Sequence, residues 1–134
     1  MQDEMKVTFP GGKKVDAEYK GFVIKTDQPV YQGGEGTAPA PFDLFLASIA
    51  TCAGIYVVAF CQNRGISLEK ASLVMRREIN TETKMISKLI IEIYLPPDFP
   101  TKYKKAVIKS VDQCAVKVHM EKPPEFVTEV KIGD

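Results

Sequence analysis

The sequence predicts a single α+β domain in which short antiparallel strands accompany one long apolar helix. Three observations support this prediction. Short segments of alternating polarity separated by glycine turns open the chain, an 18-residue run without charge follows, and a second pair of alternating segments comes after it. The chain has 134 residues and no internal repeat, so residues 1–134 are expected to form one domain.

Three strands are expected before the long helix, at residues 5–9, 15–19 and 22–26. Pro-Gly-Gly and Lys-Gly turns separate them. Residues 27–41 are rich in Gly and Pro and contain Gly-Gly-Glu-Gly, but they lack the Gly-Lys-Ser/Thr ending of a phosphate-binding loop. We therefore interpret this segment as a flexible connector.

The uncharged run at residues 44–61 predicts one helix of about six turns. Pro41 and Asp43 are typical of the first turn of a helix, and Arg64 and Gly65 are typical of its end. The helix is apolar on every side and therefore requires burial all round. Its length is at the lower limit for a membrane span and 26% of all residues are charged, which favours a buried helix in a soluble assembly over a transmembrane one.

An antiparallel hairpin is expected at residues 68–80 and 85–95. The alternation of side chains places Arg77 on the apolar face of this hairpin, the face that would pack on helices. Pro residues end the hairpin, and Thr101 is expected to cap a helix at residues 102–111.

The last part of the chain is expected to hold a further helical turn and a final strand. Cys114 and His119 lie in the helical turn, which ends at Pro123, and the strand covers residues 126–132. The order strands, helix, strands, helix, strand defines the α+β class.

Charge and composition exclude several classes of function. A net charge of +1 and a pI near 7.6 give no electrostatic basis for binding nucleic acid or an anionic membrane surface. The acidic start of the chain, Met-Gln-Asp-Glu, is not followed by the apolar segment of a secretory signal. Three cysteines, an odd number, argue against a secreted disulfide framework. We therefore expect a cytoplasmic protein with no nucleic-acid or membrane partner.

Helical spacing separates the three cysteines. Cys52 and Cys61 are nine residues apart in one helix, about 900° of rotation, so they point to opposite sides and cannot pair. Cys114 belongs to another helix and is free to approach Cys52, although the spacing does not show that it does. A free cysteine most often serves as a small buried apolar side chain. With His119 as the single histidine and no Cys-x-x-Cys spacing, neither a metal nor another cofactor is expected.

Two motifs carry a resemblance to a known family. Residues 38–52 read Ala-Pro-Ala-Pro-Phe-Asp-Leu-Phe-Leu-Ala-Ser-Ile-Ala-Thr-Cys, and residues 112–116 read Asp-Gln-Cys-Ala-Val. Together they resemble the OsmC/Ohr family of thiol peroxidases, whose order of strands and helices agrees with nearly the whole chain. The resemblance implies an intertwined homodimer with two long central helices wrapped by sheets and active sites at the subunit interface. A partner subunit would explain a helix that is apolar on every side.

The resemblance also implies a reaction, the reduction of an organic hydroperoxide or hydrogen peroxide. Cys52 would be the thiol that attacks the O–O bond and becomes a sulfenic acid. Cys114 would resolve that sulfenic acid as a Cys52–Cys114 disulfide, which an external dithiol would reduce.

An ionised Cys52 requires a source of positive potential, because a thiol with an ordinary pKa of about 8.5 is mostly protonated at neutral pH. In the family an arginine from the N-terminal hairpin provides it and a glutamate near the start of the long helix holds that arginine. This sequence has no arginine before Arg64. Arg77 is the substitute that the strand alternation predicts, ahead of Lys13 and Lys14; alternatively, its guanidinium extends to solvent or pairs with a structural carboxylate. Asp43 takes the acidic position, where it either holds a cation or stabilises the first turn of the helix.

Two other functions remain open at this point. The chain could be a non-catalytic protein that binds a small apolar ligand in an interface pocket lined by Phe42, Phe45 and Tyr56. It could also be a redox-sensing dimer in which a disulfide alters a surface for a partner. Peroxide consumption and its dependence on Cys52 distinguish both from a peroxidase.

Overall fold

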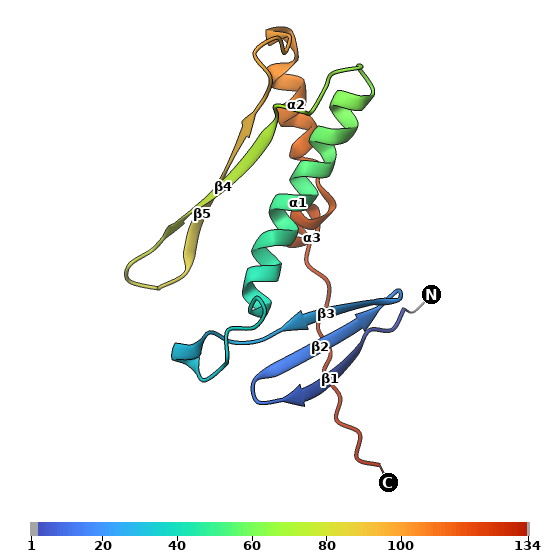
Figure 1. Ribbon diagram of the computed structural model, residues 1–134, viewed down its shortest axis with the longest axis vertical. Coiled ribbons are helices and arrows are strands. Elements are labelled where there is room, and N and C mark those ends of the chain that lie inside the picture. The colour runs from blue at the N-terminus through green and yellow to red at the C-terminus, as the bar shows by residue number, and fades with distance from the viewer. Residues whose placement is uncertain (1–2, 134) are drawn as a thin grey trace. The chain divides into compact units, whose positions relative to one another are not determined.

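The computed structural model describes residues 3–133 and confirms the α+β class. The chain divides into two compact units, Met1–Ala47 and Ser48–Asp134, each of which is described by itself. The first unit contains a three-stranded antiparallel sheet and the second contains a two-stranded one (Figure 1). One long helix, α1, begins in the first unit and runs through the second.

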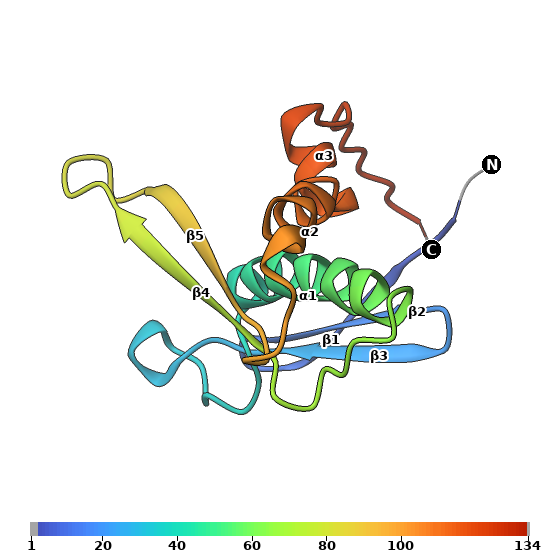
Figure 2. The same cartoon turned by 90° about the horizontal axis from the view of Figure 1, so that it is seen from above.

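The sheet of the first unit is a simple meander of β1 (Lys6–Gly11), β2 (Lys14–Tyr19) and β3 (Phe22–Thr26). The three strands lie side by side in Figures 1 and 2. The turn between β2 and β3 holds Lys20 at φ 52° and Gly21 at φ 82°, a left-handed conformation that glycine accepts without strain. All three predicted strands are therefore confirmed.

One face of this sheet is apolar and uncovered. Ala17 pairs with Ile24 and Tyr19 pairs with Phe22, so these side chains share a face. Phe22 is 72% exposed, and Phe9 of β1 is 79% exposed. An alternating strand normally buries its apolar side, so this face lacks a packing partner within the first unit.

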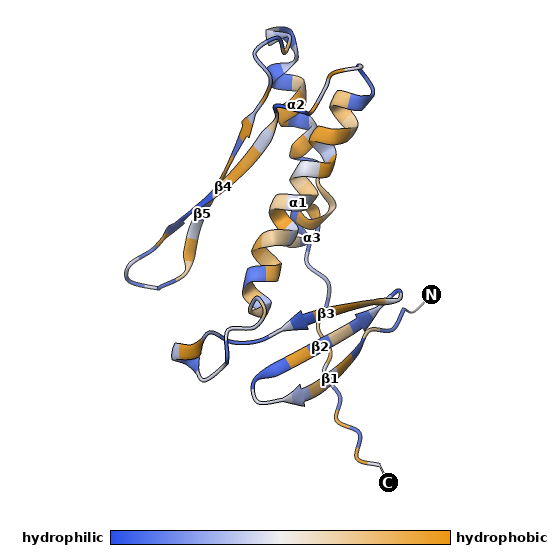
Figure 3. Ribbon diagram, viewed as in Figure 1, coloured by the Kyte–Doolittle hydropathy of each residue, from blue (hydrophilic) through white to orange (hydrophobic). Residues whose placement is uncertain are grey.

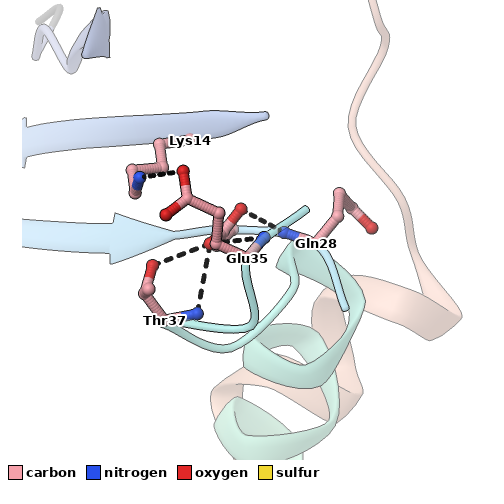
Figure 4. Close-up of polar contacts among 5 residues, drawn as sticks. Lys14, Gln28, Glu35 and Thr37 are labelled. Carbon is pink, nitrogen blue, oxygen red and sulfur yellow. Dashed lines mark hydrogen bonds and ion pairs between the residues drawn. The ribbon is translucent and has the colours of Figure 1, made fainter. Parts of the chain in front are cut away.

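The segment between β3 and α1 is an ordered loop built around the carboxylate of Asp27. Asp27 is 1% exposed and accepts four hydrogen bonds, from the backbone N–H groups of Gln28, Glu35 and Thr37 and from the Thr37 hydroxyl (Figure 4). These bonds lower the pKa of Asp27 to about 2, with the Thr37 hydroxyl as the largest contribution. Donors near the start of the loop, at Gln28, and near its end, at Glu35 and Thr37, all bind this one buried carboxylate. The loop is therefore ordered, and its interpretation as a flexible connector was wrong.

Two further contacts complete this loop. Lys14 of β2 forms an ion pair with Glu35 at 2.9 Å, which ties the loop to the sheet (Figure 4). Gly34 packs so closely on the backbone that an added Cβ would lie 2.0 Å from the carbonyl oxygen of Gln28. Only glycine fits at this position.

Helix α1 (Pro41–Gln62) confirms the predicted long helix and its ends. At the start, the Asp43 carboxylate accepts the Ala40 N–H at 3.0 Å. At the end, Gly65 takes φ 65° and the Ile66 N–H donates to the Cys61 carbonyl at 2.9 Å, which closes the helix with a glycine cap.

The apolar character of α1 extends along its length, as Figure 3 shows. By length and composition it is the one helix among residues 3–133 that could cross a membrane, a property it shares with core helices of soluble proteins. The single chain buries only part of its surface: Ile49, Ala53, Val57, Phe60 and Cys61. Ile55 is 57% exposed, so burial all round is not achieved within one chain.

The predicted hairpin forms as β4 (Ser72–Ile79) and β5 (Ile86–Tyr94). Both strands are shorter than the predicted segments, 68–80 and 85–95. Its outer face is polar and carries an ion pair between Arg76 and Glu92, whose other carboxylate oxygen accepts the Tyr94 hydroxyl. Its inner face packs on the helices through Leu73 of β4 and through apolar residues of β5 and its end, Ile91, Ile93 and Leu95.

The core of the second unit lies between α1, this hairpin and α2 (Lys104–Val111), which runs beside α1 in Figures 1 and 2. Its buried members are Ala53, Val57, Phe60, Cys61, Phe99, Val107 and Val111. Thr101 does not cap α2, contrary to expectation. It opens a 3-10 turn, Thr101–Tyr103, and the N-cap of α2 is Tyr103, whose side chain makes no capping hydrogen bond.

Helix α3 (Ala115–Glu121) follows, and Cys114 precedes it as its N-cap instead of lying inside a helical turn. The final strand expected at residues 126–132 does not form in the single chain. This tail is extended and exposed, with Phe126 at 86% and Ile132 at 95%. A strand needs a neighbouring strand for its backbone hydrogen bonds, and the described part of this chain supplies none here.

Candidate functional site

In the second unit the side chains of Cys52 and Cys114 lie near enough for each to shift the pKa of the other. Cys52 projects from the middle of α1, and Cys114 lies at the short turn that joins α2 to α3. This turn is closed by the Cys114 N–H, which donates to the Val111 carbonyl at 3.1 Å. Both thiols are free, as is that of Cys61. The approach of Cys114 to Cys52, which spacing left open, is therefore confirmed.

Cys52 lies in an environment that favours its thiolate. The backbone N–H of Val116 hydrogen-bonds to its sulfur and is the main cause of a lowered pKa, opposed by partial burial. The Cys114 thiol and the Ala115 N–H lower the pKa of Cys52 further. The first amides of α3 thus provide positive potential at the sulfur without a charged side chain.

Cys114 has the opposite character. It is 2% exposed, and burial raises the pKa of its thiol. Its sulfur accepts the Lys117 N–H at 3.4 Å, which caps α3, and the neighbouring Cys52 raises the pKa of Cys114 further. Of the two sulfurs, Cys52 ionises first and Cys114 holds the proton.

An ion pair spans the same turn. The Lys117 ammonium lies 3.0 Å from a carboxylate oxygen of Asp112, two residues before the cap. Both side chains are about half exposed, so the pair contributes little to overall stability. Its geometric effect is to hold the turn that presents Cys114 and the first amides of α3.

A cavity of about 320 Å³ adjoins the cysteine pair within the second unit. Its walls come from α1, β5, α2 and α3, and most are apolar side chains: Ile49, Ala53, Leu89, Ile91, Ile93, Ile108, Val111 and Met120. Cys114 belongs to the lining, together with Asp112 and Lys117, whereas Cys52 does not. The two sulfurs therefore face different surroundings.

Arg77 lies on the predicted face of β4, close to the turn that joins β4 to β5. It pairs with Leu89, a cavity residue, and its side chain is exposed. Asp43 accepts the Ala40 N–H at the start of α1, which is the first-turn role considered above. Lys14 is paired with Glu35. Catalytic roles for Arg77 and Asp43 stay predictions.

The remaining candidate residues have structural positions. Cys61 is fully buried in the core, and burial raises the pKa of its thiol. The Nδ1 atom of His119 lies 2.7 Å from the Ala115 carbonyl within α3. Over residues 3–133 no three His, Cys, Asp or Glu side chains gather as a metal-binding group.

The sequence reasoning missed the amides of Ala115 and Val116. Every residue except proline carries such a group, so its type gives no signal, and only the turn after α2 aims these two at Cys52. The reasoning also missed Asp27 as the organiser of its loop. Its place at the start of a loop that contains three Gly residues and Thr37 was the available indication.

Solved structures share this fold over most of their length. A protein from Psychrobacter arcticus 273-4, described as an osmotic stress induced and detoxification response protein, matches with a TM-score of 0.73 at 23% identity, covering 88% of this chain and 89% of that one. An OsmC-like protein from Mycoplasma pneumoniae matches with a TM-score of 0.62 at 15% identity, covering 92% and 91%. An organic hydroperoxide resistance protein OsmC from Legionella pneumophila matches with a TM-score of 0.56 at 20% identity, covering 90% of both.

Sequence comparison leads to the same family. No protein with a curated description matches the chain significantly. The family model described as OsmC-like protein matches residues 34–129, which include the long helix, the hairpin and both cysteines of the site. The chain therefore belongs to the OsmC-like family.

Proposed function

We propose that this protein reduces hydroperoxides, organic ones or hydrogen peroxide, with Cys52 as the attacking thiol. The observation that carries the proposal is the set of hydrogen bonds to the Cys52 sulfur, from two backbone amides and from the Cys114 thiol. A structural relative from L. pneumophila is named an organic hydroperoxide resistance protein, which supports the same chemistry.

The reaction has three balanced steps. The Cys52 thiolate attacks one oxygen of the peroxide, the O–O bond breaks, and an alcohol or water leaves with a proton while Cys52 becomes a sulfenic acid. The Cys114 sulfur then attacks the Cys52 sulfur, water leaves, and a disulfide forms. An external dithiol supplies two electrons, becomes a disulfide itself and restores both thiols. The proximity of the two thiols, each of which shifts the pKa of the other, supports the second step.

An intertwined homodimer is part of this proposal, because the chain leaves three apolar surfaces uncovered. They are the Phe9 and Phe22 face of the first sheet, the exposed side of α1 around Ile55, and the tail from Phe126 to Ile132. Soluble proteins rarely expose so many large apolar side chains. A second copy of the chain would cover these surfaces. Its packing would also bring Arg77 and Asp43 to the cysteine pair, where they would act. Free thiols of this kind also suit the reducing cytoplasm.

Turnover of cumene hydroperoxide with dithiothreitol tests the proposal in wild type, Cys52→Ser, Cys114→Ser and Cys61→Ser. We expect Cys52→Ser to abolish consumption. Cys114→Ser should retain the first step and accumulate a sulfenic acid on Cys52, which a dimedone-type reagent labels. Cys61→Ser should have the same activity per folded molecule as wild type. Equal turnover in wild type and Cys52→Ser would contradict the proposal and direct attention to ligand binding.

A further inference from the structure

A second pocket of about 320 Å³ lies between the last turn of α1 and the helix α2 beside it (Figure 1). It is separate from the cavity that Cys114 lines, because the two share no residue. Most of its lining is polar, and two members of the lining are cations: Asn63, Arg64, Lys109, Ser110 and Gln113. Among the described residues no Asp or Glu lines it. The pocket therefore carries positive charge.

The guanidinium of Arg64 is held in one position by three contacts. Its central carbon lies 3.7 Å from the centroid of the Phe60 ring and 5.2 Å from that of the Tyr103 ring. One of its N–H groups donates to the Phe60 carbonyl at 3.1 Å. A guanidinium has its donors in one plane, so stacking on the rings fixes that plane and leaves the other donors at its edge. A fork fixed in this way matches two oxygens of a carboxylate or phosphate and loses little entropy on binding.

The charge of the pocket is not neutralised within the chain. Neither Arg64 nor Lys109 forms an ion pair with a carboxylate of residues 3–133. Both cations lie near the ends of helices, where backbone carbonyls carry partial negative charge. Capping of a helix end accounts for Arg64, which bonds the Phe60 carbonyl, but the ammonium of Lys109 makes no such bond to any residue that the structure describes. Two full positive charges therefore remain for an outside anion.

We propose that this pocket binds a phosphate dianion, with Arg64 donating to two of its oxygens and Lys109 balancing its second charge. Two cations match a dianion better than they match a single carboxylate. Ser110 and the side-chain amides of Asn63 and Gln113 provide neutral hydrogen bonds in the same lining.

The size of the pocket indicates the kind of phosphate. Its volume is at the lower end of the range of about 300–1,000 Å³ that small-molecule sites occupy. Ala59 and Ala106 lie in its wall, and their single methyl groups leave space between the two helices. This space exceeds what a bare phosphate ion fills. A small phosphate monoester is therefore the preferred form of the ligand over free inorganic phosphate.

Calorimetric titration of the reduced full chain tests the binding. Phenyl phosphate, inorganic phosphate and acetate are titrated separately at pH 8, with the ionic strength held constant by NaCl. We expect saturable binding of phenyl phosphate and much weaker binding of acetate. The affinity should fall as the pH drops through about 6, because a phosphate monoester then takes up a proton. Tighter binding of inorganic phosphate would support the phosphate site and identify the free ion as its ligand. Absence of saturable binding by both phosphates at millimolar concentration would overturn the inference.

Three variants locate the binding. Lys109→Gln removes a charge from the pocket, and Lys105→Gln removes the same charge from an exposed residue of α2 outside the lining. Arg64→Lys keeps the charge and loses the planar fork. We expect phenyl phosphate to bind about tenfold more weakly to Lys109→Gln and to Arg64→Lys, as loss of a charge-assisted hydrogen bond predicts. Lys105→Gln should bind like wild type. Equal affinities of Lys109→Gln and Lys105→Gln would mean that diffuse surface charge attracts the anion, and would refute the site.

Discussion

Arg77 lies directly opposite Leu89 in the ladder of β4 and β5, and Leu89 lines the cavity that contains Cys114. Opposed residues of an antiparallel pair project from the same face, so Arg77 is on the cavity side of the hairpin. Its neighbour Arg76 is on the outer side, paired with Glu92. Two adjacent arginines thus occupy opposite faces, which gives a natural comparison.

Replacing Arg77 should weaken the thiolate of Cys52 if the guanidinium acts on the site. We expect Arg77→Gln to shift the pH dependence of Cys52 alkylation to higher pH and to slow peroxide reduction several-fold at pH 7, because a nearby cation favours the thiolate. Arg76→Gln should change neither quantity. Matching profiles for the two variants would show that the amides of α3 act without help from Arg77.

Asp27 should make the stability of the protein depend on acid in a defined range. Its folded pKa, about 2, is below the ordinary value near 3.9, so its ionised form stabilises the fold above about pH 4. This stabilisation is lost as the pH falls from about 4 through about 2. Asp27→Asn should lower Tm by several degrees at pH 7 and flatten the dependence of Tm on pH between 4 and 2.

Glu18→Gln is the control for that measurement, since Glu18 is an exposed residue of the neighbouring strand β2. It should leave both Tm and its pH dependence close to wild type. A Tm for Asp27→Asn that equals the control would mean that the four hydrogen bonds to this carboxylate do not support the loop.

Cys61 should matter for stability and not for chemistry. It is 0% exposed and belongs to the core around Phe60 and Val107. Cys61→Ser should reduce the free energy of unfolding by about 1–3 kcal/mol, because a hydroxyl without a partner is buried there. Cys61→Ala should cost less. Denaturant titration gives these values, and an unchanged turnover per folded molecule in both variants is expected. A selective loss of turnover in stable Cys61→Ala would assign this thiol a role in catalysis.

The exposed tail should determine the oligomeric state. Phe126, Val130 and Ile132 alternate along an extended backbone and are at least 85% exposed, as expected for a strand that lacks its partner. The double change Phe126→Asp and Val130→Asp should shift the protein from dimer to monomer in size-exclusion chromatography with light scattering. Glu129→Gln with Lys131→Gln, on the other side of the tail, should remain dimeric. A wild-type monomer at micromolar concentration would refute the dimer.

Periodicity and end signals predicted most of the elements. The ends of α1 were marked by Pro41, Asp43 and Gly65, because capping is a local property of the chain. The strands of both sheets followed from alternation and turn residues for the same reason. The tail was different: its alternation has strand character, yet a strand also depends on a neighbour that no local pattern specifies.

The site also contains some residues that the sequence predicted and others that it did not. Resemblance of motifs indicated Cys52 and Cys114, and helical geometry placed Cys61 on the far side of α1. The sequence predicted a charged side chain as the source of positive potential. Because no arginine precedes Arg64, that side chain was expected to be Arg77. The structure instead shows the amides of Val116 and Ala115 at the sulfur.

Local sequence patterns are sufficient to predict the α+β class, the long apolar helix, the hairpins and the two cysteine motifs, because each depends on residues close together in the chain. Tertiary contacts, by contrast, bring Cys52 and Cys114 together, place Cys114 in the lining of a cavity and put Asp27 at the centre of its loop. These features depend on where the turn between α2 and α3 and the loop before α1 place backbone amides. Amides are identical at almost every position, so their function comes from position alone.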